Sequence, residues 1–437
     1  MAAWRSTQVQ ASGQWRAIPI LLSTVLIALL APGASPSTPT PKHITVWFHA
    51  GLGQALDAMR LTFRDFEADQ DRYTVDLSLV PEGAYVDAVR VAGNSGDLPC
   101  LLALDAPTIA HFAWLGYLQP LDKFVTPELR RDLLPSILEQ GTYQRRLYAI
   151  GIYNSGLAIF GNRRHLRAAG VRLATVDHPW TIAEFEAALQ KLKAVPGVEH
   201  PLDLKINYGR GEFFTFAFSP IVQSGGGDLI DRRSYRSARN VLDSPESVAA
   251  MTHFQRWFRK GWADPRPPND DEFVNRKASL SWAGHWTYRR YEQALGDDLV
   301  LLPMPDFGHG PKTATGTWTF TISRTCQDPD AAWALLRYSL RREKMLRWTD
   351  LHPGIPARKS VLAASPLYKP GGRLHLYLEQ LQHGWPVPRP ITPAYPAISG
   401  AFAQAVDDIL HGADVHATLS RAADQIDRDI AAHNGYQ

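Results

Sequence analysis

The sequence predicts an α/β protein built on sheets that contain parallel strands. Short apolar strands alternate with amphipathic helices from residue 43 onward. Such strand–helix–strand crossovers are the usual way to join parallel strands. The 437 residues are 45% hydrophobic and 20% charged, which is enough to build more than one core.

The strand–helix alternation is clearest in the first half of the chain. Residues 43–50 and 73–80 alternate apolar and polar side chains, as strands do. "CLLALD" at 100–105 predicts a third strand that is almost wholly apolar. Apolar residues at helical spacing over 56–66, and again around 86–89, predict helices between these strands.

Later helices are predicted from capping residues at their N-termini. A side-chain oxygen before a helix accepts hydrogen bonds from its free N–H groups, and proline is tolerated in the first turn. These signals predict helices over 181–195, 243–261 and 328–340, and amphipathic patterns predict two more near the C-terminus. The signals are Thr181 with Glu184 (a capping box), Ser244 with Pro245, and Asp328 with Pro329.

Residues 1–41 are typical of an export signal followed by a Pro/Ser/Thr linker. They hold Arg5, Arg16 and no acidic residue, and residues 17–31 are an apolar run too short to span a membrane comfortably. We therefore expect an exported, periplasmic protein, with an uncleaved signal anchor as the alternative. Since no cysteine lies nearby, we expect no lipid anchor.

Charge and cysteine content exclude some functions. The formal charge is +3, and it falls to +1 when the two arginines of residues 1–41 are removed. A nearly neutral protein gives no support for nucleic-acid binding. Only Cys100 and Cys326 are present, too few for a multi-cysteine zinc site, and we expect no metal and no cofactor.

Local catalytic motifs are missing. "GLGQAL" at 51–56 mimics a dinucleotide fingerprint, but Leu56 stands where a small residue is needed, and no acid ends the second strand. The sequence has no G-x-S-x-G, no phosphate-binding loop and no H-E-x-x-H. We therefore expect a protein that is not an enzyme, although paired glycosidase carboxylates would leave no local motif.

Seven segments, in this order, resemble family 1 extracellular solute-binding proteins of ABC importers, the group that includes maltose-binding proteins. Each segment is weakly specific, but together they run through almost all of residues 43–430. They are "ITVWFHA" (44–50), "GDLPCLLALDAPTIAHFAWLGYLQPLD" (96–122), "LYAIGIYNSGLAIFGNRRHLRAAGV" (147–171), "PWTIAEFEAALQKL" (179–192), "QSGGGDLID" (223–231), "FVNRKASLSWAGHW" (273–286) and "GIPARKSV" (354–361).

The resemblance implies a two-lobed periplasmic-binding-protein-like fold of class II, with a ligand cleft between lobes that are mixed sheets flanked by helices. After residues 1–41, it places 42–152 and about 313–357 in lobe 1, and about 153–312 and 358–437 in lobe 2. It also implies a monomer that closes about a hinge on a neutral sugar and delivers it to the transmembrane permease of an ABC importer. The alternatives are a non-sugar solute on the same fold and an extracytoplasmic carbohydrate-active enzyme.

Aromatic faces and polar groups bind opposite features of a sugar, its C–H face and its hydroxyl rim. By resemblance, Trp286 is the stacking residue of lobe 2, and we expect Gly284 to let the backbone turn tightly before it. Each proposed contact has an alternative role in core packing, hinge packing or helix capping, except Glu82, whose alternative is a plain surface acid. The proposed ligand-binding residues are His49, Glu82, Tyr85, Asp105, Tyr153, Asn154, Phe214, Trp286, Trp318 and Tyr395.

The resemblance also bears on the two cysteines. It implies that the strand over 317–326 returns from lobe 2 and lies antiparallel beside the strand that begins at Cys100. Cys100 and Cys326 then become a candidate disulfide, with two separate buried thiols as the alternative.

Overall fold

The structure is a computed structural model that describes residues 41–51 and 53–436. The expected export signal therefore lies outside the described residues. Within the described part of the chain, no helix is both long and apolar enough to cross a membrane.

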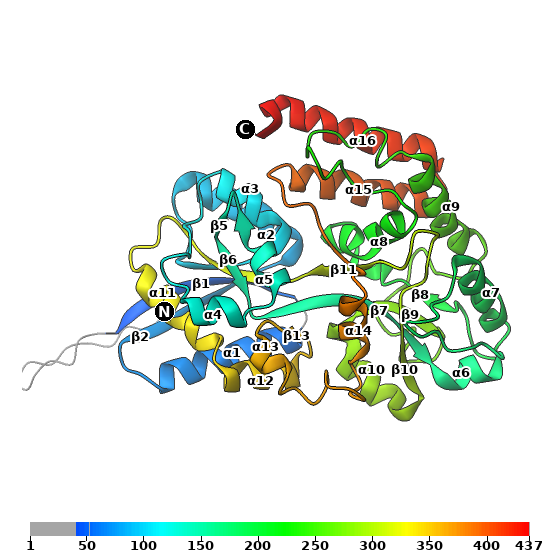
Figure 1. Ribbon diagram of the computed structural model, residues 1–437, viewed down its shortest axis with the longest axis horizontal. Coiled ribbons are helices and arrows are strands. Elements are labelled where there is room, and N and C mark those ends of the chain that lie inside the picture. The colour runs from blue at the N-terminus through cyan, green and yellow to red at the C-terminus, as the bar shows by residue number, and fades with distance from the viewer. Residues whose placement is uncertain (1–40, 52, 437) are drawn as a thin grey trace, which may run out of the picture. The chain divides into compact units, whose positions relative to one another are not determined.

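The first sheet has five strands in the order β2–β1–β3–β12–β6 (Figure 1). β1 pairs in parallel with both β2 and β3, as predicted, and β12 inserts antiparallel between β3 and β6. The strands are β1 (Lys42–His49), β2 (Tyr73–Val80), β3 (Leu101–Asp105), β6 (Ala149–Gly151) and β12 (Trp318–Ile322).

The second sheet has seven strands and is organised around β7, the longest of them. Its main path is β14–β11–β7–β9–β8, and β10 and β13 also pair with β7. The strands are β7 (Tyr153–Asn162), β8 (Leu202–Asp203), β9 (Leu280–Gly284), β10 (Leu299–Leu302), β11 (Thr313–Gly316), β13 (Ile355–Pro356) and β14 (Pro386–Pro388). A separate small hairpin joins β4 (Thr142–Tyr143) to β5 (Arg146–Leu147).

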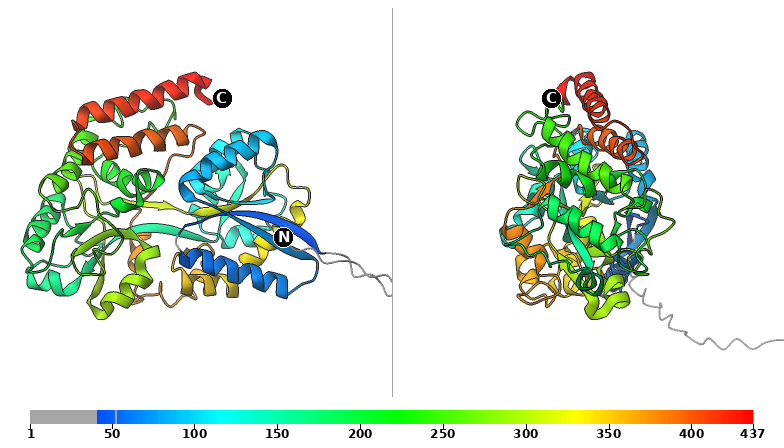
Figure 2. Two further views of the ribbon diagram at one scale, coloured as in Figure 1. Left: turned by 180° about the vertical axis from the view of Figure 1, so that it is seen from behind. Right: turned by 90° about the vertical axis from the view of Figure 1, so that its right-hand side faces the viewer.

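Helices cover the faces of both sheets. α1, α11 and α12 pack on one another below the first sheet in Figure 1, and α2 and α3 lie above it. α15 and α16 lie side by side in both views of Figure 2. The helices are α1 (Gly53–Ala68), α2 (Glu82–Ser95), α3 (Ile109–Trp114), α4 (Pro127–Asp132), α5 (Pro135–Gln140), α6 (Arg163–Ala168), α7 (Ile182–Lys193), α8 (Glu212–Ser224), α9 (Pro245–Arg259), α10 (Tyr288–Leu295), α11 (Pro329–Ser339), α12 (Arg342–Leu351), α13 (Lys359–Leu362), α14 (Leu376–Gln382), α15 (Tyr395–Leu410) and α16 (Val415–Ala432).

The three predicted caps are present. Thr181 and Glu184 form a capping box before α7, Ser244 accepts a bond from the third residue of the next helix, and Asp328 does the same for α11. β9 begins at Leu280 and runs to Gly284. We call the first sheet with its helices lobe 1, and the second sheet with its helices lobe 2.

The chain passes between the sheets three times, at two neighbouring points and again between β12 and β13. β6 ends at Gly151 and β7 begins at Tyr153, while β11 ends at Gly316 and β12 begins at Trp318. The structure joins Cys100 and Cys326 in a disulfide with Cα atoms 4.4 Å apart. This bond ties the residue before β3 to the segment after β12, so it fastens the returning strand to its neighbour in lobe 1.

Candidate functional site

Three strand ends of lobe 1 bring together His49, Asp105 and Trp318. Trp318, the first residue of β12, pairs with Asp105, the last residue of β3. His49, the last residue of β1, stacks on the Trp318 indole with ring centroids 3.7 Å apart. Tyr85 meets that indole edge-on, but it is buried and donates to the backbone oxygen of Trp47, so it supports Trp318 from within lobe 1.

The Asp105 carboxylate neither caps its helix nor stands unpaired. The Arg389 guanidinium, which follows β14 in lobe 2, binds it in bidentate fashion, with Nη1–Oδ2 and Nη2–Oδ1 distances of 2.7 and 2.8 Å. The same guanidinium binds the carboxylate of Glu212 at the start of α8. Arg389 therefore bridges an acid of lobe 1 to an acid of lobe 2.

The Glu212 carboxylate is held by its own lobe as well. The hydroxyls of Tyr395 and Ser399, both on α15, donate hydrogen bonds to it. Burial raises the pKa of Glu212 above its usual range, while the Arg389 guanidinium acts in the opposite direction. The proposed residue Tyr395 is thus buried, and its hydroxyl reaches this cluster.

Arg389 fits closely into its position. It is 5% exposed, and the Phe216 ring lies 5.0 Å from the guanidinium carbon. Gly316 leaves room for it, because a Cβ there would lie 2.3 Å from Nη2. The cavity beside Arg389 measures about 10 Å³, which is room for about one water molecule.

Trp286 explains why a glycine precedes it at the end of β9. The expectation that Gly284 allows a tight turn is wrong, because its φ is −107°, which other residues adopt readily. A Cβ at position 284 would instead lie 1.9 Å from Cζ3 of the Trp286 indole. Gly284 therefore makes space for the indole to fold back over the strand.

The Trp286 indole is half-buried and rests on an aromatic base. Phe213 and Phe216 pack against it, with ring centroids 6.4 and 6.0 Å away, and its Nε1 donates to the Tyr208 hydroxyl at 3.3 Å. Phe214, which the sequence analysis proposed as a ligand contact, points elsewhere. It is buried in the lobe 2 core against Phe218, while its sequence neighbours contact Trp286.

A pair of buried imidazoles lies next to Trp286. His285, beside Trp286, places its Nε2 3.0 Å from Nε2 of His352, which follows α12. Burial lowers the pKa of His352 from 6.5 to about 4 and that of His285 well below its usual range. Burial also lowers the pKa of His49 to about 3, and the neighbouring His352 adds to this effect.

The two residues proposed at the crossover have packing partners. Tyr153 lies edge-on to both His285 and His352, with centroids 5.5 and 5.0 Å away. The Asn154 amide accepts from Thr315 and donates to Ser136, so it is engaged where the chain passes between the sheets. The side chain of Glu82, also proposed from the sequence, lies outside what the structure describes.

These residues come from both lobes and lie where the lobes meet, and we call the set the interlobe ring. Each lobe contributes one charged side chain and three aromatic or imidazole rings. Its members are Asp105, Arg389, Phe216, Trp286, His285 and His352, each in contact with the next, together with Trp318, which stacks on His49 and whose backbone pairs with that of Asp105.

Sequence reasoning placed His49, Asp105, Trp286 and Trp318 near one another, but it missed the polar partners that close the ring. Arg389, the cation between Asp105 and Glu212, was not among the residues proposed from the sequence. Arg389 stands in "PVPRP", where nothing local predicts burial. Glu212, His285 and His352 were also missed. The apolar neighbours of Glu212 in "EFFTFAF" were the one available signal.

Comparison with known proteins gives this geometry a context. The sequence model described as bacterial extracellular solute-binding protein matches residues 62–371. The maltotriose-binding protein of Pyrococcus abyssi is 23% identical over 354 residues, 78% of this chain and 72% of that protein. An uncharacterized lipoprotein of Streptomyces antibioticus is 24% identical over 343 residues, 75% of this chain and 74% of the other.

Solved structures share the fold. The GacH receptor of Streptomyces glaucescens, solved unliganded and with acarbose, is 20% identical with a TM-score of 0.77, covering 91% of this chain and 100% of that one. The cyclic α-maltosyl-1,6-maltose binding protein of Arthrobacter globiformis is 23% identical with a TM-score of 0.70, covering 89% and 98%. The predicted two-lobed fold is confirmed, and the chain belongs to the bacterial extracellular solute-binding protein family.

Proposed function

We propose that this protein captures a neutral sugar or oligosaccharide at the interlobe ring and delivers it to the permease of an ABC importer. The main support for the proposal is that the interlobe ring contains both half-buried indoles and a charged cluster. The indoles are Trp286 and Trp318, and the cluster is Asp105, Arg389 and Glu212. Indole faces suit the C–H face of a pyranose, and the charged groups suit its hydroxyls. The sugar ligands named for its relatives support this choice.

The charge of the cluster bears on the ligand class. Asp105 and Glu212 outnumber Arg389, so the three groups together favour neutral or cationic ligands over anionic ones. A hydroxyl can donate to either carboxylate and accept from the guanidinium, whereas a polyamine would use only the acids. A non-sugar solute remains the second hypothesis for the same site.

Ligand entry requires the ring to open. The cavity beside Arg389 has room for about one water, far less than a sugar needs. We therefore infer that the lobes separate about the three crossovers, two of which lie near Ile152 and Thr317, and that ligand shifts the equilibrium back toward closure. This mechanism needs no chemical step, and we propose a monomeric binding protein that is neither an enzyme nor a nucleic-acid-binding protein.

Export without a lipid anchor completes the proposal. Membership of an extracellular family fits the signal-like residues 1–41. The only cysteines of the sequence, Cys100 and Cys326, are bonded to each other, so neither is left to carry a lipid.

Ligand screening followed by Trp286→Ala tests the function. A thermal-shift screen over mono- and oligosaccharides, polyamines and sugar phosphates should find a neutral sugar, since a bound ligand raises stability by mass action. Titration calorimetry should then show Trp286→Ala binding this sugar more weakly by about 2–4 kcal/mol, as for an aromatic anchor.

The control is Trp114→Ala, which removes another half-buried indole that packs on Tyr436 outside the ring. It should bind with unchanged affinity, and mass analysis should return the sugar intact. A polyamine as the sole ligand, normal affinity in Trp286→Ala, or turnover products would each contradict the proposal.

A further inference from the structure

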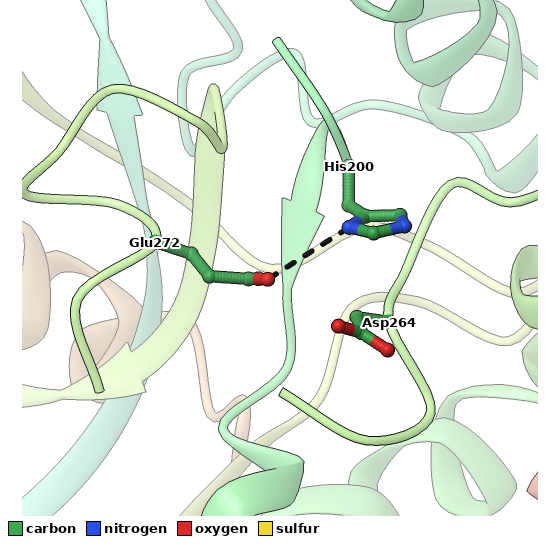
Figure 3. Close-up of side chains that lie close together, drawn as sticks. All are labelled: His200, Asp264 and Glu272. Atoms are coloured by element: carbon green, nitrogen blue, oxygen red, sulfur yellow. Dashed lines mark ion pairs between the residues drawn. The ribbon is translucent and has the colours of Figure 1, made fainter. Parts of the chain in front are cut away.

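A second cluster of polar side chains lies in lobe 2 and takes no part in the interlobe ring. His200 precedes β8, and Asp264 and Glu272 lie in the loop between α9 and β9. One ligand atom from each lies within 4.8 Å of the others, the only such group among the described residues. Figure 3 shows the three side chains converging from three chain segments.

The spacing between His200 and Glu272 suits a shared ion better than a direct bond. The distance from His200 Nδ1 to Glu272 Oε1 is 3.7 Å, beyond the usual range of a hydrogen bond. Two ligands of one tetrahedral Zn²⁺, each about 2.0–2.2 Å from the metal, lie about 3.4 Å apart. A small movement therefore lets both atoms bind one ion.

Burial adds a second, independent observation. Nδ1 of His200 is buried and makes no hydrogen bond within the described residues. The Glu272 residue is 9% exposed, so its carboxylate is largely withdrawn from water. A buried carboxylate is stable only when it is paired, hydrogen-bonded or bound to a metal. The neighbouring cation Lys277 is paired with Glu199 instead.

Backbone hydrogen bonds connect the segments that carry the three side chains. The amide of Leu202 donates to the Trp262 carbonyl at 2.9 Å, and the amide of Glu199 donates to the Lys277 carbonyl at 2.9 Å. The Lys277 amide in turn donates to the Glu272 carbonyl at 2.9 Å. The three side chains therefore stand on segments that backbone hydrogen bonds hold together.

We propose that His200, Asp264 and Glu272 form a Zn²⁺ site, with water as a fourth ligand. One imidazole and two carboxylates are donors that zinc accepts, and the two negative charges neutralise a divalent ion. Calcium prefers six to eight oxygen ligands, and magnesium prefers oxygen donors in an octahedral arrangement. The metal would tie the loop at 264–272 to the segment before β8.

Titration calorimetry tests this site. The protein is purified without a polyhistidine tag, and a chelator removes any bound metal before the titration. We expect one equivalent of Zn²⁺ to bind and to raise the melting temperature, with much weaker effects from Ca²⁺ and Mg²⁺. His200→Ala and Asp264→Asn should each weaken zinc binding by at least about tenfold. Asp264→Asn changes a half-exposed residue, so it keeps the test valid if His200→Ala folds poorly.

His411→Gln is the matched control. His411 Nδ1 lies 3.6 Å from Asp407 Oδ1, nearly the same histidine–carboxylate spacing, but the described residues supply no third ligand there. It should bind zinc as the unchanged protein does. The proposal is overturned if zinc does not bind, if His200→Ala and Asp264→Asn bind it normally, or if His411→Gln loses it. None of these outcomes depends on whether the interlobe ring binds a sugar.

Discussion

Two buried cations, Lys205 and Arg389, have similar surroundings but different positions in the molecule. Lys205 is fully buried in lobe 2, and its Nζ lies 2.6 Å from a carboxylate oxygen of Asp203 and of Asp270. Arg389 is also buried and is also bracketed by two acids. The acids around Lys205 belong to one lobe, whereas those around Arg389 belong to two.

The backbone at Lys205 and the contacts of its acids show what this cluster supports. Lys205 has a φ of +56°, a strained value for a side chain with a Cβ, and its amide donates to Asp203 at 3.0 Å. Asp270 then contacts the Tyr208 hydroxyl, which receives the Trp286 Nε1 bond. The Lys205 cluster is therefore a scaffold beneath Trp286, while the Arg389 cluster joins the two lobes.

Removing Lys205 should have the largest effect on stability. Burial raises the pKa of Asp203 even with the lysine beside it, so Lys205→Met leaves a buried acid without its cation. Breaking such a pair costs about 3–5 kcal/mol of unfolding free energy. Urea denaturation measures this, with exposed Lys369→Met as the control. An unchanged midpoint in Lys205→Met would show that the cluster is not a scaffold.

The sequence could predict what local patterns determine. Thr181, Ser244 and Asp328 were recognised as caps because a cap depends on residues three positions away. The ends of β1 and β3 were recognised because alternation and apolar runs mark strands, and parallel strands place their ends at one edge. His49 and Asp105 could therefore be located without knowing their partners.

The partners depend on folding across long separations. Arg389 meets Asp105 over 284 residues, and His285 meets His352 over 67. Gly284 was interpreted through backbone freedom, but the indole two residues later decides its role through space. Phe214 was chosen over Phe216 because helical phase cannot be fixed to one residue when all sides of a segment are apolar. The proposed ligand roles, the lobe boundaries and the monomeric state stay predictions.

The His285–His352 pair also joins the two lobes, but its imidazoles are neutral, unlike the charged groups around Lys205 and Arg389. Unfolded histidines take up protons near pH 6.5, whereas His352 stays neutral down to about pH 4. The unfolded state therefore binds more protons between these values, and the free energy of unfolding falls as the pH falls through this window. His352 alone accounts for about 3 kcal/mol of that loss.

Melting temperatures between pH 7.5 and pH 4 measure this slope. His352→Gln should flatten it, because glutamine does not titrate, whereas His416→Gln on the exposed surface of α16 should leave it unchanged. A slope that is identical in His352→Gln and in the unchanged protein would mean that acid sensitivity arises elsewhere.

The smallest expected loss of stability, and the largest change of conformation, comes from Arg389→Met. Asp105 and Glu212 lose their common cation, but they stand on different lobes and can regain water when the lobes separate. The free energy of unfolding should therefore fall by about 1–3 kcal/mol, the range for leaving polar groups unsatisfied, which is less than the loss expected for Lys205→Met.

Small-angle X-ray scattering should show a larger radius of gyration for the ligand-free variant, and the sugar found by screening should reduce it again. Arg131→Met, which removes a surface ion pair with Glu128, should change neither property measurably. If Arg389→Met instead matched Lys205→Met in stability loss and kept the compact dimensions, both cations would be scaffolds and the interlobe ring would have to open elsewhere.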